Sequence, residues 1–359
     1  VGVKCEVDML SVREFLPGVD PHSWDGRCVQ ALAWMEGARE VGLALEALHE
    51  PDRCGREGGM LVFASRMHGL GAQVHYLTEA LTTAFRQGKA FQIAAPPSDV
   101  NCGAMRGGHL LAHELFACFL EPYLSANCSQ HARVGEAQDP EDGSMYHADE
   151  HQRDPKESRF WWRAQAAAFL LRPARPLHSL LRQARASLGL SQGPYIAVHV
   201  RHGDACMHAS ISTFRPACLP WSAYLARVRE MQARYGISRV FLATDDPAVA
   251  LEAKKAEGIT VSHLPFDRSF MLADWFLEFR VEQGLASASL VTASALLDLL
   301  LLSEGDYLVG TFASHLSRLS LELMAARLGF VPPYASVDYP WCFHVMRKGH
   351  VPGYGEVSC

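Results

Sequence analysis

The sequence predicts an α/β protein whose C-terminal half is a doubly wound parallel sheet, and three observations lead to this fold class. From residue 194 onward, short apolar runs alternate with amphipathic stretches, which is the pattern of strands and helices in a parallel sheet. Polar, glycine-containing clusters follow the predicted strands, where open α/β sheets bind ligands. The length of 359 residues exceeds one ordinary core, so two domains are expected.

The N-terminal domain, residues 1–185, is predicted to be a less regular α/β unit. Apolar runs at Met60–Ala64 and Ala90–Ala94 indicate buried strands. Between them, apolar residues recur every four positions over Leu77–Phe85, the spacing of one helix face. Residues 130–158 contain almost no apolar side chains and are predicted to form a surface loop.

The C-terminal domain, residues 186–345, is followed by a tail at 346–359. Strands are predicted at Tyr195–Val200, Arg239–Ala243, Ile259–Leu264 and Asp306–Val309. Helices are predicted from an N-cap at Ser222, from Pro247 in a first turn, over Leu285–Leu302, and from Ser314. Because strand and helix alternate throughout, the strands are expected to run parallel.

The charge and hydropathy of the chain exclude several classes of function. The net charge is −6 and the pI is near 6.3, so there is no basic excess for binding nucleic acid or an anionic membrane. The longest apolar run, Ala295–Leu302, contains Asp298 and is too short to span a bilayer. Because the chain begins at Val1, a membrane anchor or targeting segment outside it is compatible with the sequence.

The ten cysteines are dispersed and form no C-x-x-C pair, which argues against a zinc ribbon or a thioredoxin-like site. An even, dispersed set fits structural disulfides in an oxidising compartment, and reduced, buried thiols of a cytosolic protein are the alternative.

A short glycine turn, His68-Gly69-Leu70-Gly71, follows a predicted strand and opens a predicted helix. Gly69 and Gly71 would let the backbone approach a phosphate, whose charge the helix N-terminus attracts. The spacing lacks the full dinucleotide fingerprint, and a tight turn explains both glycines equally well.

The cluster from His199 to Asp204 carries the clearest anion-binding chemistry. Arg201 lies one residue past a predicted strand, where a guanidinium can grip a phosphate with two parallel hydrogen bonds. A surface salt bridge is the alternative for this arginine. Asp204 and His202 are candidates either for orienting Arg201 or for acid–base work. His199 falls inside the strand pattern, which is typical of a hydrogen-bonded core histidine.

Polar residues also mark two other strand ends and one apolar helix. Asp245 could meet a sugar or ribose hydroxyl, whereas Asp246 precedes Pro247 and fits a helix N-cap. Asp298 lies in a leucine-rich helix and must find a donor, either a protein group or a guanine edge. Thr311 and Ser314 form either a second phosphate cup or a simple helix cap.

Read together, these segments resemble the core alpha-1,6-fucosyltransferase family, which includes the rhizobial nodulation fucosyltransferases. The similarity runs in order from about Cys54 to about Met324. The motifs that carry it are Phe160-Trp161-Trp162-Arg163-Ala164-Gln165 with Leu171-Arg172-Pro173, Val198-His199-Val200-Arg201-His202, Leu242-Ala243-Thr244-Asp245-Asp246-Pro247 with Glu252-Ala253-Lys254, and Leu297-Asp298 with Asp306-Tyr307-Leu308-Val309-Gly310-Thr311-Phe312-Ala313-Ser314.

The resemblance implies a GT-B-like fold, in which two Rossmann-type domains face a cleft. It also implies an inverting, metal-independent transfer of a sugar, most often fucose, from a GDP-sugar. By motif match, Arg201 contacts the diphosphate with help from Gly69, Gly71 and Ser314, and His199 and Asp298 contact the guanine. His202, Asp245 and Thr311 complete the predicted donor site.

The resemblance also predicts a disulfide and points to a missing base. Cys54 and Cys102 fall where the family has a bridge, and Cys206–Cys218 is a second predicted pair. In the family, the loop after the arginine carries a lysine and a catalytic glutamate, and Ala205–Ser212 contains neither. The base is therefore assigned to Asp204 or His208, the latter with a reference pKa near neutrality, and Arg201 acts in place of a metal ion.

The sequence thus predicts a glycosyltransferase of the secretory-pathway lumen, most often the Golgi, that acts on a glycan or glycoprotein acceptor. No cofactor beyond the GDP-sugar substrate is expected, and the oligomeric state is left open. Two alternatives stay open: transfer to a protein Ser/Thr or to a polysaccharide other than an N-glycan, and a catalytically silent sugar-nucleotide or glycan-binding protein.

Overall fold

A computed structural model describes residues 37–49, 60–63, 69–93, 118–121, 159–207, 218–271, 277–338 and 341. The chain divides into two compact units, and the main part of the second begins at Pro176. The first unit contains β1 (Met60–Phe63), α3 (Leu70–Arg86), β2 (Ala90–Ile93) and α5 (Arg159–Leu170).

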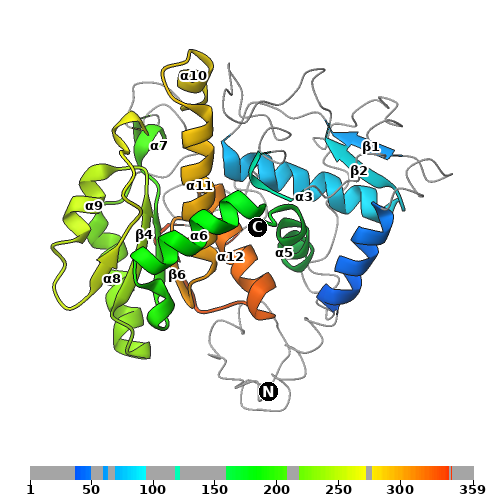
Figure 1. Cartoon of the computed structure of the whole chain (residues 1–359). Coiled ribbons are helices and arrows are strands. Elements are labelled where there is room, and N and C mark those ends of the chain that lie inside the picture. Colours follow the sequence, from blue (N-terminus) through cyan, green and yellow to red (C-terminus); the bar gives the residue numbers. More distant parts are fainter. Residues whose placement is uncertain are drawn as a thin grey trace, which may run out of the picture. The chain divides into compact units, whose positions relative to one another are not determined.

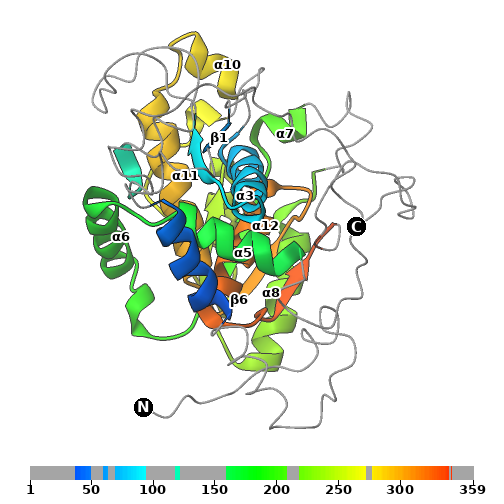
Figure 2. The same ribbon diagram turned by 90° about the vertical axis from the view of Figure 1, so that its right-hand side faces the viewer.

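The first unit is built around a parallel pair of strands. β1 and β2 pair from Met60 opposite Ala90 to Phe63 opposite Ile93. α3 connects them, packs against both, and lies beside α5 (Figures 1 and 2). The predicted apolar face of this helix is buried, with Leu77 and Leu81 at most 1% exposed. The strand–helix–strand prediction for this region is confirmed.

The second unit contains a five-stranded sheet in which every neighbouring pair is parallel. The strands are β3 (Ile196–Val200), β4 (Arg239–Thr244), β5 (Thr260–Ser262), β6 (Tyr307–Gly310) and β7 (Tyr334–Ser336), in the order β5-β4-β3-β6-β7. The chain therefore starts in the middle of the sheet, winds to one edge, and returns to the other side of β3. This is the doubly wound order, with its topological switch point between β3 and β6.

Helices cover both faces of this sheet, as the prediction requires (Figure 1). The described α-helices after residue 200 are α7 (Gly203–Met207), α8 (Trp221–Tyr235), α9 (Pro247–Ala253), α10 (Leu277–Glu282), α11 (Ala288–Ser303) and α12 (His315–Leu328), and of these α8, α9 and α11 pack against the strands. α8 and α9 pack on the face formed by Ile196, Val198 and Val200. Side chains alternate across a strand, so His199 points to the opposite face, where it meets α12.

Two predicted helix starts are wrong. α8 begins at Trp221 with Pro220 as its N-cap, so Ser222 does not cap it. Trp221 is 2% exposed. Because this side chain packs in the core, the helix begins two residues earlier than predicted. α11 begins after Ser287, whose hydroxyl accepts from the Leu290 amide, because Gly284 at φ +72° ends the preceding segment.

Within the described ranges, no helix combines the length and the apolar character that crossing a bilayer requires. The arrangement of the two domains about a cleft stays a prediction.

Candidate functional site

Several predicted polar residues of the second unit lie at the carboxyl ends of the strands, around the topological switch point. In the parallel register, His199 lies opposite Gly310, Val200 opposite Thr244, and Gly310 opposite Ser336. Arg201, Asp245 and Thr311 directly follow β3, β4 and β6, and Asp338 is the second residue after β7. The structure therefore brings Arg201 to Asp245, 44 positions away in sequence, and Thr311 to Asp338, 27 positions away.

Arg201 is held by two carboxylates. Its Nη1 donates to Asp245 Oδ2 and its Nη2 donates to Asp204 Oδ1. The arginine side chain is 32% exposed, whereas those of Asp204 and Asp245 are 5% and 13% exposed. An arginine has five N–H groups, so two ion pairs leave donors for a further anion. The guanidinium is thus oriented before any ligand arrives.

Gly203 makes this clamp possible and was missed by the sequence analysis. Its φ is +36°, in the region that L side chains rarely adopt. A Cβ at this position would lie 2.7 Å from Asp245 Oδ2 and 2.9 Å from Arg201 Nη1. The sequence signal was a glycine directly after the Arg201-His202 pair, and it could be interpreted only with the clamp in view.

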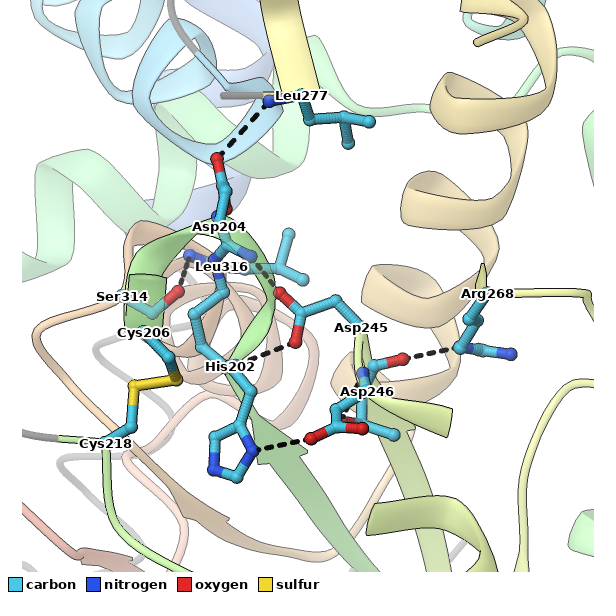
Figure 3. A network of polar contacts seen from close by, with 12 residues as sticks. His202, Asp204, Cys206, Cys218, Asp245, Asp246, Arg268, Leu277, Ser314 and Leu316 are labelled. Atoms are coloured by element: carbon cyan, nitrogen blue, oxygen red, sulfur yellow. Dashed lines mark hydrogen bonds and ion pairs between the residues drawn. A yellow bond between two sulfur atoms is a disulfide. The ribbon is translucent and has the colours of Figure 1, made fainter. Parts of the chain in front are cut away.

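His202 links three segments around the clamp (Figure 3). Its backbone amide donates to Asp245 Oδ1 at 2.7 Å. Its ring contacts Asp246 Oδ2 through Nδ1 at 3.0 Å and the Leu219 carbonyl through Nε2 at 2.8 Å. The ring is therefore held between the carboxylate that caps α9 and the segment before α8. His202 therefore acts within the protein scaffold and orients the segment that carries Arg201.

The predicted Cys206–Cys218 disulfide is confirmed, with Cα atoms 5.4 Å apart (Figure 3). It joins α7 to the segment just before α8. Cys118 is also disulfide-bonded. The predicted Cys54–Cys102 pair lies outside the described residues, as does His208.

Asp204 is engaged at both of its oxygens. Oδ1 pairs with Arg201, and Oδ2 accepts from the Leu277 amide at 3.4 Å (Figure 3). Of the two roles open to Asp204, the geometry favours orienting Arg201.

Asp246 fits its predicted cap. Its Oδ1 accepts from the Ala248 amide at 2.8 Å, and Pro247 occupies the first turn of α9.

Asp298 finds a protein donor that the sequence analysis did not identify. Arg268 Nη2 donates to both of its oxygens, at 2.9 and 3.1 Å. Burial raises the pKa of Asp298 to about 6, and the charge of Arg268 opposes that rise. Arg268 also donates to the carbonyls of Thr244 and Leu264. The one sequence signal was the buried carboxylate itself, which required a partner without specifying it.

His199 is buried and paired inside the fold. Its Nδ1 lies 2.6 Å from Ser317 Oγ. Burial, followed by the charge of Arg201, lowers its pKa to about 3, so the ring is neutral at physiological pH. The structure places it as a hydrogen-bonded core histidine at the end of β3.

The β6–α12 turn is occupied by a carboxylate of the chain itself. The Thr311 hydroxyl donates to Asp338 Oδ2, and the Phe312 amide donates to Asp338 Oδ1 at 2.6 Å. Ser314 Oγ accepts from the Leu316 amide at 3.3 Å (Figure 3). Thr311 thus turns toward the protein, and Ser314 caps α12.

Gly69 and Gly71 lie at the start of α3 in the first unit. Gly69 is the N-cap, with φ −58°, and Gly71 is buried in the first turn. The cap therefore does not use the left-handed conformation that glycine allows.

The described residues contain no group of three or more His, Cys, Asp or Glu side chains arranged to hold a metal ion. The Asp245-Asp246 pair, which resembles a metal motif in sequence, is engaged by Arg201, His202 and the Ala248 amide.

The strand order defines a Rossmann-type unit, and the clamped arginine lies at its topological switch point. The family model of alpha-(1,6)-fucosyltransferase N- and catalytic domains matches residues 146–337, more than half of the chain. The chain belongs to this family, and the resemblance seen in its motifs is confirmed.

Individual relatives are distant. An alpha-(1,6)-fucosyltransferase of Drosophila melanogaster is 26% identical over 170 residues, which make up 46% of this chain and 25% of that protein. The chain therefore spans about a quarter of the length of this curated relative. NodZ alpha-1,6-fucosyltransferase soaked with GDP-fucose matches with a TM-score of 0.45 and 17% identity, over 74% of this chain and 92% of that one. POFUT1 in complex with GDP-fucose matches with a TM-score of 0.40 and 13% identity, over 80% and 99%.

Proposed function

We propose that this protein is a glycosyltransferase that moves fucose from GDP-fucose to a glycan acceptor. Family membership supports the reaction class. The observation that carries the proposal is the clamp on Arg201: a guanidinium oriented by two carboxylates, with unused N–H donors, at the point where a Rossmann-type sheet binds nucleotides.

The proposed chemistry is a single inverting displacement. The bond between fucose C1 and the β-phosphate oxygen breaks as the acceptor oxygen bonds to C1 from the opposite side. Negative charge grows on the departing GDP, and Arg201 stabilises it. Asp204 and Asp245 hold the guanidinium in place, so little reorientation is needed during the reaction. In this proposal Arg201 supplies the charge that a metal ion would otherwise supply.

The acceptor hydroxyl must lose its proton to a base. Because both oxygens of Asp204 are engaged, we assign Asp204 to positioning and His208 to the base. The remaining donor contacts are proposed for Asp298 at the guanine, Asp245 at a sugar hydroxyl and Ser314 near the phosphates, whereas Thr311 and His199 act inside the fold through Asp338 and Ser317. His202 supports Arg201.

A Golgi or other secretory-lumen location is proposed together with this function. Cys206–Cys218 and the bonded Cys118 suit an oxidising compartment. A glycoprotein or a free glycan would be the acceptor, and transfer to a protein Ser/Thr or another polysaccharide is the alternative acceptor class.

A catalytically silent binder of sugar nucleotides is the second candidate function. The observation that favours it is the absence of the family's lysine and glutamate from Ala205–Ser212.

Release of GDP from GDP-fucose, with and without glycan acceptors, separates the two functions. An enzyme releases GDP and the Arg201→Lys variant loses at least about tenfold in rate, because lysine cannot reproduce the two-carboxylate clamp. The matched control is Arg227→Lys, an exposed arginine that pairs with Glu230 three positions on, as Arg201 pairs with Asp204. GDP binding without any GDP release would support the binder, and equal rates for both variants would remove Arg201 from the mechanism.

A further inference from the structure

Asp338, just past the end of β7, fills the turn in which a Rossmann-type sheet would hold a phosphate. Its Oδ1 accepts from the Phe312 amide at 2.6 Å and from Ser336 Oγ at 2.9 Å. Its Oδ2 accepts from the Thr311 hydroxyl and from the Ala313 amide at 3.2 Å. Four donors converge on one carboxylate, which is the number of acceptor positions it offers.

The carboxylate is fixed to the sheet from both sides. β7 pairs with β6 up to Ser336 opposite Gly310, and the Val337 amide donates to the Gly310 carbonyl at 3.0 Å. Below the turn, Tyr224 is 1% exposed and hydrogen-bonded to Thr311. Burial, and then the charge of Asp338, raises the pKa of Tyr224 above its ordinary value, so its hydroxyl stays neutral. Asp338 therefore occupies a rigid position.

Within the turn, the hydrogen bonds to Asp338 involve only the first three residues. Thr311, Phe312 and Ala313 donate to Asp338, whereas Ser314 follows at the start of α12 and accepts from the Leu316 amide. The Ser314 amide donates to the Thr311 carbonyl at 3.1 Å, so the placement of Ser314 depends on the turn that Asp338 organises. Gly310, the last residue of β6, also pairs with His199 of β3, two residues before Arg201.

We infer that Asp338 is a positioning residue for the donor diphosphate: it holds the β6–α12 turn so that Ser314 and the first turn of α12 are set beside the Arg201 segment. The inference rests on the proposed function, because it presumes a GDP-sugar at this edge. Like a bound phosphate, the Asp338 carboxylate accepts hydrogen bonds from the turn. Ser314 and the first turn of α12 are therefore ordered before the GDP-sugar binds.

The direction in which GDP affinity changes distinguishes this positioning role from a carboxylate that competes with phosphate. A carboxylate that merely competed with phosphate would repel GDP, so neutralising it would tighten binding. A positioning carboxylate has the opposite signature, since its loss disorders the turn. Isothermal titration of the whole chain with GDP should show that Asp338→Asn raises the dissociation constant about tenfold, the scale of one charge-assisted hydrogen bond.

The matched control is Asp306→Asn. Asp306 also accepts a backbone hydrogen bond, from the Tyr195 amide at 3.1 Å, but it lies before β6, at the opposite end of the same strand. A purely structural role predicts that both variants lower the melting temperature and leave GDP affinity unchanged. The positioning role predicts weaker GDP binding for Asp338→Asn alone, together with faster amide hydrogen exchange at Phe312 and Ala313.

Ser336→Ala is a milder variant that tests the same role if Asp338→Asn does not fold. Ser336→Ala removes one of the four donors and leaves the carboxylate, and it should weaken GDP binding about threefold. Unchanged or tighter GDP binding in the folded variants overturns the inference. If the wild-type chain itself does not bind GDP, the proposed function fails, which is a separate result.

Discussion

Arg201 and Asp245 approach each other across Gly203, and the absence of a side chain there decides the geometry of the clamp. Gly203 combines a φ of +36° with a site where an added Cβ meets Asp245 Oδ2 at 2.7 Å. The same residue therefore has both a conformational and a steric reason to be glycine.

Gly203→Ala should lower the free energy of unfolding by about 2–3 kcal/mol, because backbone strain and overlap add together. Urea unfolding measures this loss, and GDP titration should show weaker binding because Arg201 is displaced. Gly236→Ala is the matched control: its φ is +70°, but nothing lies within 4 Å of the added Cβ, so it should cost only about 1 kcal/mol. Equal losses for the two variants would contradict the steric part of the argument.

Asp298 gives the second prediction at the scale of single residues. Burial raises its pKa from 3.8 to about 6, so the folded chain holds this proton more tightly than the unfolded chain does. The stabilising contribution of the group is therefore complete below the unfolded pKa and is lost as the pH rises through the folded pKa.

Comparison of the wild type with Asp298→Asn isolates this contribution, since asparagine does not titrate. The difference in unfolding free energy, wild type minus variant, should fall as the pH is raised from 4 to 7. Urea unfolding at intervals over that range measures it. A difference that grows with pH would mean that the ion pair with Arg268 outweighs the burial of Asp298.

At the scale of elements, the Cys206–Cys218 disulfide connects α7, which carries Asp204, to the segment before α8. The two cysteines are 12 positions apart. Leu219, whose carbonyl accepts from His202, directly follows Cys218, so the bridge and the histidine hold the same segment.

Replacing both cysteines, Cys206→Ser with Cys218→Ser, should lower the free energy of unfolding by about 3 kcal/mol, as expected for a loop of this length. Thermal or urea unfolding without reductant measures the loss while other disulfides stay intact. Arg227→Lys, on the exposed side of α8, provides a control that should stay within about 0.5 kcal/mol of the wild type. A double variant as stable as the wild type would show that the other contacts alone hold this segment.

At the scale of the whole molecule, the strand order puts the candidate donor residues that follow β3, β4 and β6 at the carboxyl ends of the strands, whereas Asp298 lies within α11. A ligand bound there stabilises only the folded chain, so saturation with GDP should raise the melting temperature. At 100 times its dissociation constant the gain is about 2.7 kcal/mol.

A thermal-shift series with GDP and ADP at equal concentrations tests this expectation. GDP should give the larger shift, because a carboxylate such as Asp298 accepts from the N–H edge of guanine, and adenine lacks that edge. Arg201→Lys should reduce the shift with both nucleotides, since the lost contact is to the diphosphate. Equal shifts for GDP and ADP would remove Asp298 from nucleotide recognition.

Much of the fold was accessible from local patterns. The strands around Val198, Leu242 and Leu308 were predicted because they are short apolar runs in an alternating sequence, and buried parallel strands need little else. The cap at Asp246 was predicted because its contacts are local. The helix starts at Ser222 and Leu285 were wrong because burial of Trp221 and the backbone of Gly284 overrode the local signals.

The sequence by itself determined the α/β class, the parallel sheet, the family and the presence of Arg201 at a strand end, since each depends on residues close together in the chain. Only the tertiary structure decided what these residues contact: Asp204 and Asp245 for Arg201, Arg268 for Asp298, and Asp338 for the turn after β6. The physical reason is that ion pairs and hydrogen bonds between separate strand ends depend on sheet order and register. Those are set by the packing of the whole unit, and no short segment encodes them.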